Sequence, residues 1–190
     1  EWNDIPELTV GNFAEKAADA KEGNDIEKVW MTADDENLYF CIKCANPIKK
    51  KSDWYPTFIV IDIDNNPKTG YPSKPLGIDY LIQPFGETRQ DIMIHRRRAE
   101  GNNSGWSLWH DAVIVDKAYI VGSGDNNNCV EMRIPWRDIG ISDSEKANFR
   151  FRIEDGSVGL YPESGDWVPD LETQKDIQYP NAGKPEWNDD

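Results

Sequence analysis

The stretch VWMTADDENLYFCIKCA, residues 29–45, decides the fold class. From residue 38 onward every second side chain is apolar, at Leu38, Phe40, Ile42 and Cys44. This period of two is typical of a half-buried β-strand. The acidic and amide residues 34–37 separate it from the shorter apolar run 29–33, a pattern that predicts a hairpin turn between two strands.

The rest of the chain is punctuated in the same way. Short apolar runs at residues 57–63, 78–85, 91–97, 109–115, 118–121, 129–134 and 147–153 alternate with clusters of Asn, Asp, Gly and Pro. The composition of residues 13–21 is also compatible with a helix. Many short strands with regular turns predict an all-β fold, a jelly-roll-type β-sandwich of two antiparallel sheets.

Charge and length limit the classes of function. The 190 residues suit one domain, and 21 Lys and Arg stand against 35 Asp and Glu, a formal net charge of -14. An acidic chain is poorly suited to nucleic acids or anionic membranes, and no aliphatic run is long enough for membrane insertion. Cations and neutral ligands such as sugars stay open as partners.

The two ends of the sequence share a motif. EWND at residues 186–189 repeats EWND at residues 1–4, behind the linker-like residues 181–185. We therefore expect residues 1–180 to form one β-sandwich module and residues 181–190 to be a linker and the start of a possible next module. Adjacent modules in the same parent chain are then expected partners.

Three cysteines leave their own state open. Cys41 and Cys44 are three residues apart in a predicted strand, so their side chains leave opposite faces and cannot chelate one metal ion. Either all three are buried thiols, or Cys129 forms a disulfide with one of the other two.

The strongest local motif follows the apolar run 57–61. Asp62, Asp64 and Asn66 alternate, so a curling loop can point all three side-chain oxygens inward. Lys68 would add its backbone carbonyl, and Asp79 on the next strand could complete the set. Hard cations such as Ca²⁺ take six to eight oxygen ligands of these kinds. We predict a structural calcium site, with a polar hairpin turn as the alternative.

This motif also carries a family resemblance. FIVIDIDNNPKTGYP (residues 58–72) with GIDYLI (residues 77–82) resembles the central hairpin of family 9-like carbohydrate-binding modules, part of a wider DOMON-like β-sandwich group. EWNDIPEL (1–8), WMTADDENLYFCIKC (30–44), CVEMRIPWRDIGI (129–141), FRFRIED (149–155) and SGDWVPD (164–170) are similar to other parts of such modules, in the same order. The resemblance implies a secreted or cell-surface accessory domain of bacteria that binds a polysaccharide or oligosaccharide and carries structural calcium.

The sequence departs from the family pattern at two polar positions. The family commonly has a glutamate on the strand before the calcium loop, and residues 57–61 contain no carboxylate. The arginine expected in the family's pocket is also missing from residues 78–85. Gln83 and Asp79 are the polar side chains there, which makes Gln83 a candidate sugar contact.

Tryptophans are the other candidate ligand contacts, because sugars stack their C–H faces on aromatic rings. Comparable modules carry a stacking Trp near Trp54, which lies in a polar loop before the calcium strand. We expect calcium to brace that loop. Trp167, in the late loop 165–169, is a second candidate, and Trp106 and Trp109 are weaker ones. Each can instead anchor a loop or fill the core.

Catalysis is not expected, because the sequence has no nucleophile elbow, zinc-ligand pair or phosphate loop. The function predicted is that of a non-catalytic carbohydrate-binding module. The main alternative is a calcium-stabilised structural or adhesion spacer of a cell-surface protein. A haem-binding redox domain is a weaker alternative, since Met93 and His95 lie two apart on one predicted strand and cannot bind opposite sides of a haem.

Overall fold

The computed structural model describes residues 2–8, 26–45, 47, 58–73, 76–85, 91–97, 109–115, 117–121, 128–142 and 148–154. Regular structure in these ranges is almost entirely β-strand. The strands are β1 (Glu7–Leu8), β2 (Ile26–Ala33), β3 (Asn37–Cys44), β4 (Phe58–Asp62), β5 (Tyr71–Ser73), β6 (Leu76–Ile78), β7 (Tyr80–Phe85), β8 (Asp91–Arg97), β9 (Trp109–Val115), β10 (Tyr119–Val121), β11 (Cys129–Pro135) and β12 (Arg150–Glu154), with the 3-10 helix η3 (Trp136–Ile139) after β11.

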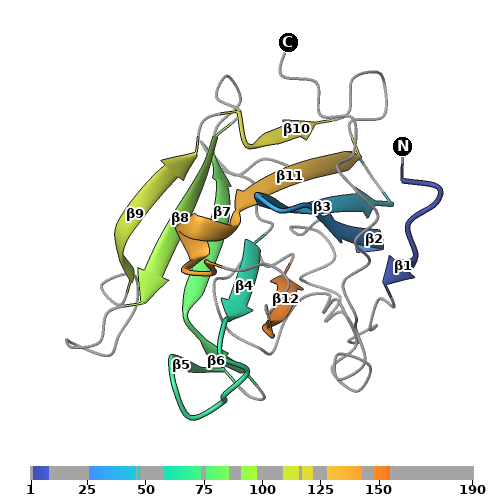
Figure 1. Ribbon diagram of the computed structural model, residues 1–190. Helices are drawn as coiled ribbons and strands as arrows, with labels where there is room; N and C mark the ends of the chain where they lie inside the picture. The colour runs from blue at the N-terminus through green and yellow to red at the C-terminus, as the bar shows by residue number, and fades with distance from the viewer. Residues whose placement is uncertain are drawn as a thin grey trace.

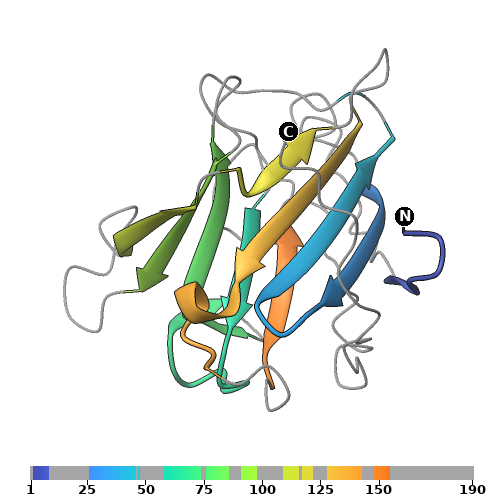
Figure 2. The same ribbon diagram turned by 45° about the horizontal axis from the view of Figure 1, so that its top comes forward.

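Two five-stranded antiparallel sheets face each other. The first has the strand order β1-β2-β3-β11-β10 and the second β12-β4-β7-β8-β9, while β5 and β6 form a separate two-stranded ladder (Figure 1). The turned view in Figure 2 shows the first sheet lying across the second. The chain changes sheets between β3 and β4, between β9 and β10 and between β11 and β12. The predicted all-β sandwich of jelly-roll type is therefore confirmed.

The core lies between the sheets, and the alternation in β3 shows how the sequence builds it. Leu38, Phe40, Ile42 and Cys44 all face this core, as predicted. The ring of Phe40 contacts the ring of Phe151, which belongs to the opposite sheet. The two rings pack in an edge-to-face arrangement, with their centroids 5.0 Å apart. Burying an apolar side chain of this size stabilises the fold by about 1.5–3 kcal/mol. The alternate residues of β3 lie on the outer face of the first sheet, where Tyr39 and Cys41 are buried as well. The prediction that this strand is half-buried is therefore wrong, because a second apolar cluster covers its other face.

The predicted hairpin turn between β2 and β3 is confirmed, and Asp34 organises it. The Asp34 Oδ1 atom accepts hydrogen bonds from the backbone N–H groups of Glu36, at 2.8 Å, and Asn37, at 2.6 Å. The Asp34 carbonyl accepts a bond of 2.9 Å from the indole of Trp136, at the start of η3. This hydrogen bond connects the turn to η3, which follows β11.

The predicted strand 78–85 is divided in two. Leu76–Ile78 pairs with β5, whereas Tyr80–Phe85 pairs with β4 and β8. Ile78 belongs to an apolar cluster outside the main core, while Tyr80 and Ile82 face the core between the sheets. Asp79 marks this change of face. Its backbone N–H donates to the Ile61 carbonyl at 2.8 Å, and its carbonyl accepts from the N–H of Arg97 at 2.8 Å.

Several predictions fall outside the described residues. They are the possible helix at 13–21, the linker and module start at 181–190, and the boundary at residue 180. These stay predictions. Within the described ranges no helix has the length and apolar character needed to cross a membrane.

Candidate functional site

The candidate site begins at Asp62, the last residue of β4. All five residues of β4 are buried, so the strand delivers a carboxylate below the surface. The Asp62 Oδ2 atom accepts a hydrogen bond from Gly77 N–H at 3.0 Å, and Oδ1 accepts one from Asn66 N–H at 3.1 Å. Asp62 therefore joins the end of β4 to the following loop and to β6.

The loop after β4 turns back on itself through short polar contacts. The Asp64 Oδ1 atom accepts from Asn66 N–H at 3.0 Å, and Asn65 has a positive φ of 52°. Gly77 lies so close to the loop that a Cβ there would overlap the carbonyl oxygens of Thr69 and Asn66. Glycine at position 77 therefore lets the loop close onto β6.

Asp79 brings a third carboxylate from the break between β6 and β7. Its Oδ2 atom accepts a hydrogen bond of 3.1 Å from Ile63 N–H. One carboxylate oxygen each of Asp62, Asp64 and Asp79 lies within 4.8 Å of the other two. Two oxygens on opposite sides of a Ca²⁺ ion lie about 5 Å apart, twice the bond length. The three carboxylates are thus close enough together to be ligands of one metal ion.

The electrostatics of the cluster favour a bound cation. Burial raises the pKa of Asp62, opposed by the hydrogen bonds from Gly77 and Asn66 and reinforced by Asp64. Burial also raises the pKa of Asp79, and the negative charges of Asp64 and Asp62 raise it further. The hydrogen bond from Ile63 N–H and the positive charge of Arg97 lower the pKa of Asp79. Crowded, partly desolvated carboxylates resist ionisation, and a divalent cation among them removes that penalty.

Asn66 and Lys68, the other two predicted ligands, take part in hydrogen bonds within the loop. The Asn66 Oδ1 atom accepts a hydrogen bond from Lys68 N–H at 3.1 Å, which folds the loop locally. The Asn66 backbone carbonyl accepts from Thr69, from N–H at 3.0 Å and from Oγ1 at 2.9 Å. Of the five predicted ligands, the structure thus brings the three aspartates together. Ligation by the Asn66 side chain and the Lys68 carbonyl stays a prediction.

Thr69 is a residue that sequence reasoning missed. Its hydroxyl lies 3.0 Å from Asp64 Oδ1, 2.9 Å from Asp64 Oδ2 and 2.9 Å from the Asn66 carbonyl, so its single hydrogen has three acceptors within reach, two of them on the exposed carboxylate of the cluster. The feature of the sequence that could have indicated this contact is a hydroxyl side chain five residues after Asp64, in a loop that turns back on itself.

Among the predicted sugar contacts, Trp54, Trp106 and Trp167 lie outside the described residues. Gln83 lies on the face of β7 that points away from the core; it is 6% exposed and pairs with Met93 of β8. Trp109 begins β9 opposite Arg97. Because Met93 and Arg97 are four residues apart on one strand, the backbones of Gln83 and Trp109 are separated by about 13 Å along the sheet.

Trp109 lies at one end of the second sheet, and Gln83 lies nearer the other end. Arg97 N–H donates to the carbonyl of Asp79, so Trp109 is at the end that carries the carboxylate cluster. The pairing of Ile59 with Ile82 instead brings Gln83 toward the start of β4. The loop containing Trp54 lies outside the described residues, so the expectation that calcium braces this loop stays a prediction.

Arg152 is a buried cation that the sequence did not reveal as such. It is fully buried on β12 opposite Val60, on the same outer face of the second sheet as Leu81.

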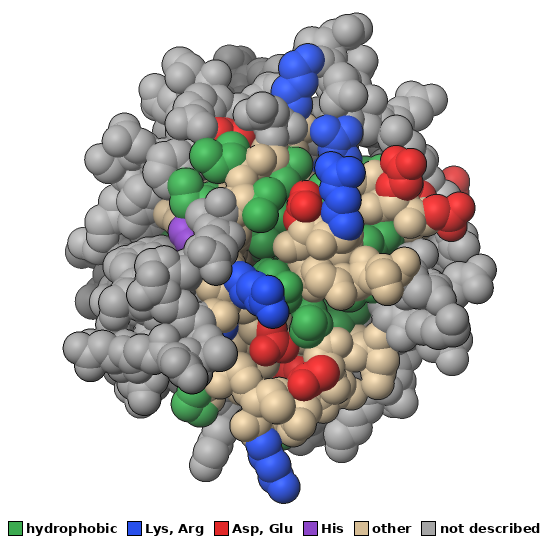
Figure 3. Space-filling model, turned by 60° about the vertical axis from the view of Figure 1, so that its left-hand side comes forward, with side chains coloured by type: hydrophobic (Ala, Val, Ile, Leu, Met, Phe, Trp, Pro, Cys, Tyr) green, Lys and Arg blue, Asp and Glu red, His purple; other side chains and the backbone are tan. Residues whose placement is uncertain are grey.

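The side of the molecule that carries β8 and β9 faces the viewer in Figure 3. Acidic, basic and hydrophobic side chains of the described residues are interspersed there. This described face does not indicate recognition of a ligand by one sign of charge.

Comparison with known proteins gives no match to a family model, a curated protein or a solved structure. Function therefore has to be argued from the residues and their geometry.

Proposed function

We propose that the chain is a non-catalytic carbohydrate-binding module, braced by one Ca²⁺ ion at Asp62, Asp64 and Asp79. It would hold a larger secreted or cell-surface protein near a polysaccharide or oligosaccharide. The observation that carries the proposal is the convergence of these three carboxylates within 4.8 Å, at the positions where the resemblance to family 9-like modules expects calcium ligands.

The role of calcium follows from what its ligands connect. Asp62 ends β4, Asp64 belongs to the loop, and Asp79 stands between β6 and β7. An ion bound to all three would add a link among segments that already meet through the pairing of β4 with β7 and through the hydrogen bonds from Gly77 and Ile63 to these carboxylates. Asn66, the Lys68 carbonyl and water would supply the remaining oxygens, since Ca²⁺ takes six to eight.

Of the proposed glycan contacts, Gln83 lies toward the start of β4, away from the carboxylate cluster. Trp54 precedes Phe58 by four residues in the sequence, and the strand pairing brings Gln83 toward the same end. A Trp ring supplies a stacking face for a sugar and an amide supplies hydrogen bonds to its hydroxyl groups. Trp167 is the partner proposed for a second stacking face. Trp106 and Trp109 would extend the site only for a longer glycan.

A polysaccharide screen of the purified protein, with calcium and with EGTA, tests the proposal. We expect binding to one polysaccharide class, loss of binding in Trp54→Ala and retained binding in Trp30→Ala. Trp30 is a suitable control because it is a partly buried tryptophan on the outer face of the other sheet. Equal binding by both variants would place the glycan site elsewhere.

The alternative is a calcium-stabilised structural or adhesion spacer, in which the same three carboxylates would bind the ion and no glycan would bind. A blank screen combined with calcium-dependent melting would support the spacer. A haem held by two side chains would need them on its opposite sides. Met31 and Met132 face the core, and Met93 and His95 lie two residues apart on the same strand, β8.

A further inference from the structure

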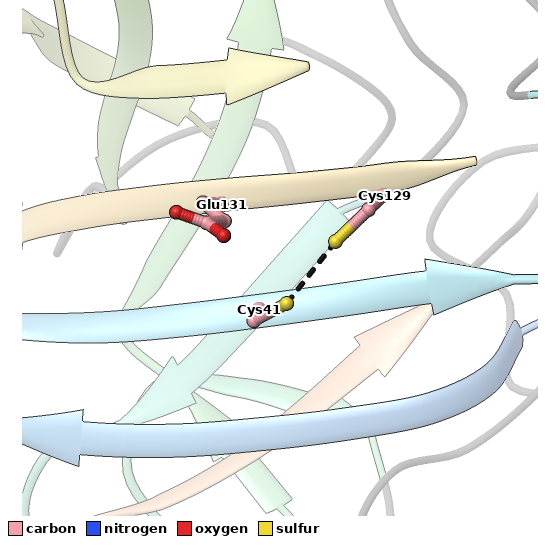
Figure 4. Close-up of side chains that lie close together, drawn as sticks. All are labelled: Cys41, Cys129 and Glu131. Atoms are coloured by element: carbon pink, nitrogen blue, oxygen red, sulfur yellow. Dashed lines mark hydrogen bonds between the residues drawn. The ribbon is translucent and has the colours of Figure 1, made fainter. Parts of the chain in front are cut away.

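A pair of cysteines lies on the outer face of the first sheet, away from the carboxylate cluster. Cys41 is on β3 and Cys129 is on β11, the neighbouring strand. Cys41 pairs with Glu131 and Cys129 pairs with Lys43, so the cysteines are diagonal neighbours on the ladder. Their Sγ atoms are 3.1 Å apart (Figure 4). Cys44 faces the core on the opposite side of the sheet.

We propose that Cys41 and Cys129 are a disulfide site, at which oxidation joins β3 to β11. A disulfide bond is about 2.05 Å long, so the sulfurs need to approach by only about 1 Å. Cys41, at 3% exposed, is buried, whereas Cys129 is half-buried. Cys129 is therefore the sulfur that an external reagent reaches first.

The reaction is thiol–disulfide exchange with a small disulfide such as oxidised glutathione as the oxidant. The Cys129 thiolate attacks one sulfur of the reagent, forms a mixed disulfide and releases one glutathione thiolate. The Cys41 thiolate then attacks the Cys129 sulfur and releases the second. The two cysteines are oxidised, one disulfide is reduced to two thiols, and the protons of the cysteines pass to those thiols. The hydrogen bond from Cys41 lowers the pKa of Cys129, although burial opposes it, which favours Cys129 as the first nucleophile.

The N-terminal segment covers this site. Trp2 and Ile5, both 8% exposed, form one apolar cluster with Tyr39 and Cys41. The indole of Trp2 donates a hydrogen bond of 3.0 Å to Glu131 Oε1. The disulfide would thus lie beneath the first residues of the module, and it would close a loop of 88 residues, a length at which a crosslink strongly restricts the unfolded chain.

A metal ion is the competing use of the same atoms. One ligand atom each of Cys41, Cys129 and Glu131 lies within 4.8 Å of the others. Two thiolates on a tetrahedral zinc ion with bonds of about 2.3 Å would stand about 3.8 Å apart. The sulfurs here are closer than that, and one Glu131 oxygen already accepts the Trp2 bond. The geometry therefore favours the disulfide.

The test is a thiol count on the full chain after equilibration with oxidised glutathione. We expect the denatured protein to fall from three reactive thiols to one, with Cys44 as the residue that remains and with Cys41 and Cys129 in one crosslinked peptide. Cys129→Ser should keep both of its thiols, apart from any mixed disulfide that reducing agent reverses. The matched control Cys44→Ser should fall from two thiols to none.

Oxidation should raise the melting temperature by about 5–15 °C in wild type and in Cys44→Ser, and leave Cys129→Ser unchanged. If wild type keeps three thiols, if Cys44 enters the bond, or if the crosslink joins two chains, the proposal is wrong. An unchanged melting temperature after the bond has formed would overturn its role in joining the strands. One zinc ion per chain that protects both thiols from oxidation would assign the site to a metal instead.

Discussion

Two acidic turns of this molecule look alike in the sequence and differ in structure. Asp34 to Asn37 follows β2, and the loop beginning at Asp62 follows β4. In the first turn the carboxylate of Asp34 is used locally: Oδ1 accepts two backbone N–H groups, and Oδ2 accepts the hydroxyl of Tyr39 at 2.9 Å. In the second, three carboxylates from different positions along the chain come together.

The difference shows that a dense run of acidic residues does not by itself bring several carboxylates together. Asp35 and Glu36 are exposed beside Asp34 and are not part of either three-ligand cluster found among the described residues. The loop after β4 is a candidate metal site for two reasons. Asp79, between β6 and β7, brings a carboxylate from outside the loop, and Asp62 is buried.

The largest effect is expected from Asp64→Asn. In wild type, calcium at about a thousandfold excess over its dissociation constant should stabilise the fold by about 4 kcal/mol, or roughly 10 °C in melting temperature. The variant should lose that response because one of three carboxylates is gone. Thermal scans of calcium-stripped protein, with and without added calcium, measure both.

The control for this prediction is Asp35→Asn, a change of the same kind at an exposed position of the first turn. It should keep the full calcium response. Without calcium, Asp64→Asn should melt slightly above wild type, because the repulsion of Asp62 and Asp79 is reduced while an amide oxygen can still accept the bond from Asn66. A normal calcium response in Asp64→Asn would remove Asp64 from the site.

A smaller effect is expected from Asp34→Ala. The change removes an acceptor from two backbone N–H groups and from the Tyr39 hydroxyl, which should cost about 1–2 kcal/mol. The melting temperature should fall by about 3–6 °C, equally with and without calcium. Denaturant unfolding in both conditions checks this. If the loss depended on calcium, the two turns would not be independent.

The smallest effect concerns pH. The pKa values of Asp62 and Asp79 are raised in the calcium-free fold, so the native state holds protons more tightly than the unfolded chain does. Its stability therefore falls as the pH rises through these pKa values, whereas calcium requires the ionised carboxylates. The increase in melting temperature on adding calcium should be a few degrees smaller near pH 5 than near pH 7. An increase that grows toward acid pH would contradict this.

Local patterns allowed much of this molecule to be predicted. The alternation of Leu38, Phe40 and Ile42 predicted a strand and its buried face, and the spacing of Asp62 and Asp64 predicted the loop. Ile78, Tyr80 and Ile82 continue the same alternation, yet Ile78 lies outside the main core. The chain changes ladders at Asp79 without any change in apolar pattern, so the sequence could not show the break.

Contacts between distant strands were also beyond local pattern. Cys41 and Cys44 were equally plausible partners of Cys129, because the choice depends on the register between β3 and β11. That register sets Glu131 opposite Cys41 and leaves Cys44 on the other face. The burial of Arg152 depends in the same way on its pairing with Val60, which lies far away in the sequence.

We propose that one calcium ion binds where Asp62, Asp64 and Asp79 meet. The most direct test is a calorimetric titration of calcium-stripped protein with Ca²⁺, carried out on wild type, Asp79→Asn and Asp35→Asn. We expect one ion bound per chain in wild type and in Asp35→Asn, and a binding site lost or severely weakened in Asp79→Asn. No binding by wild type, or equal binding by all three proteins, would contradict it.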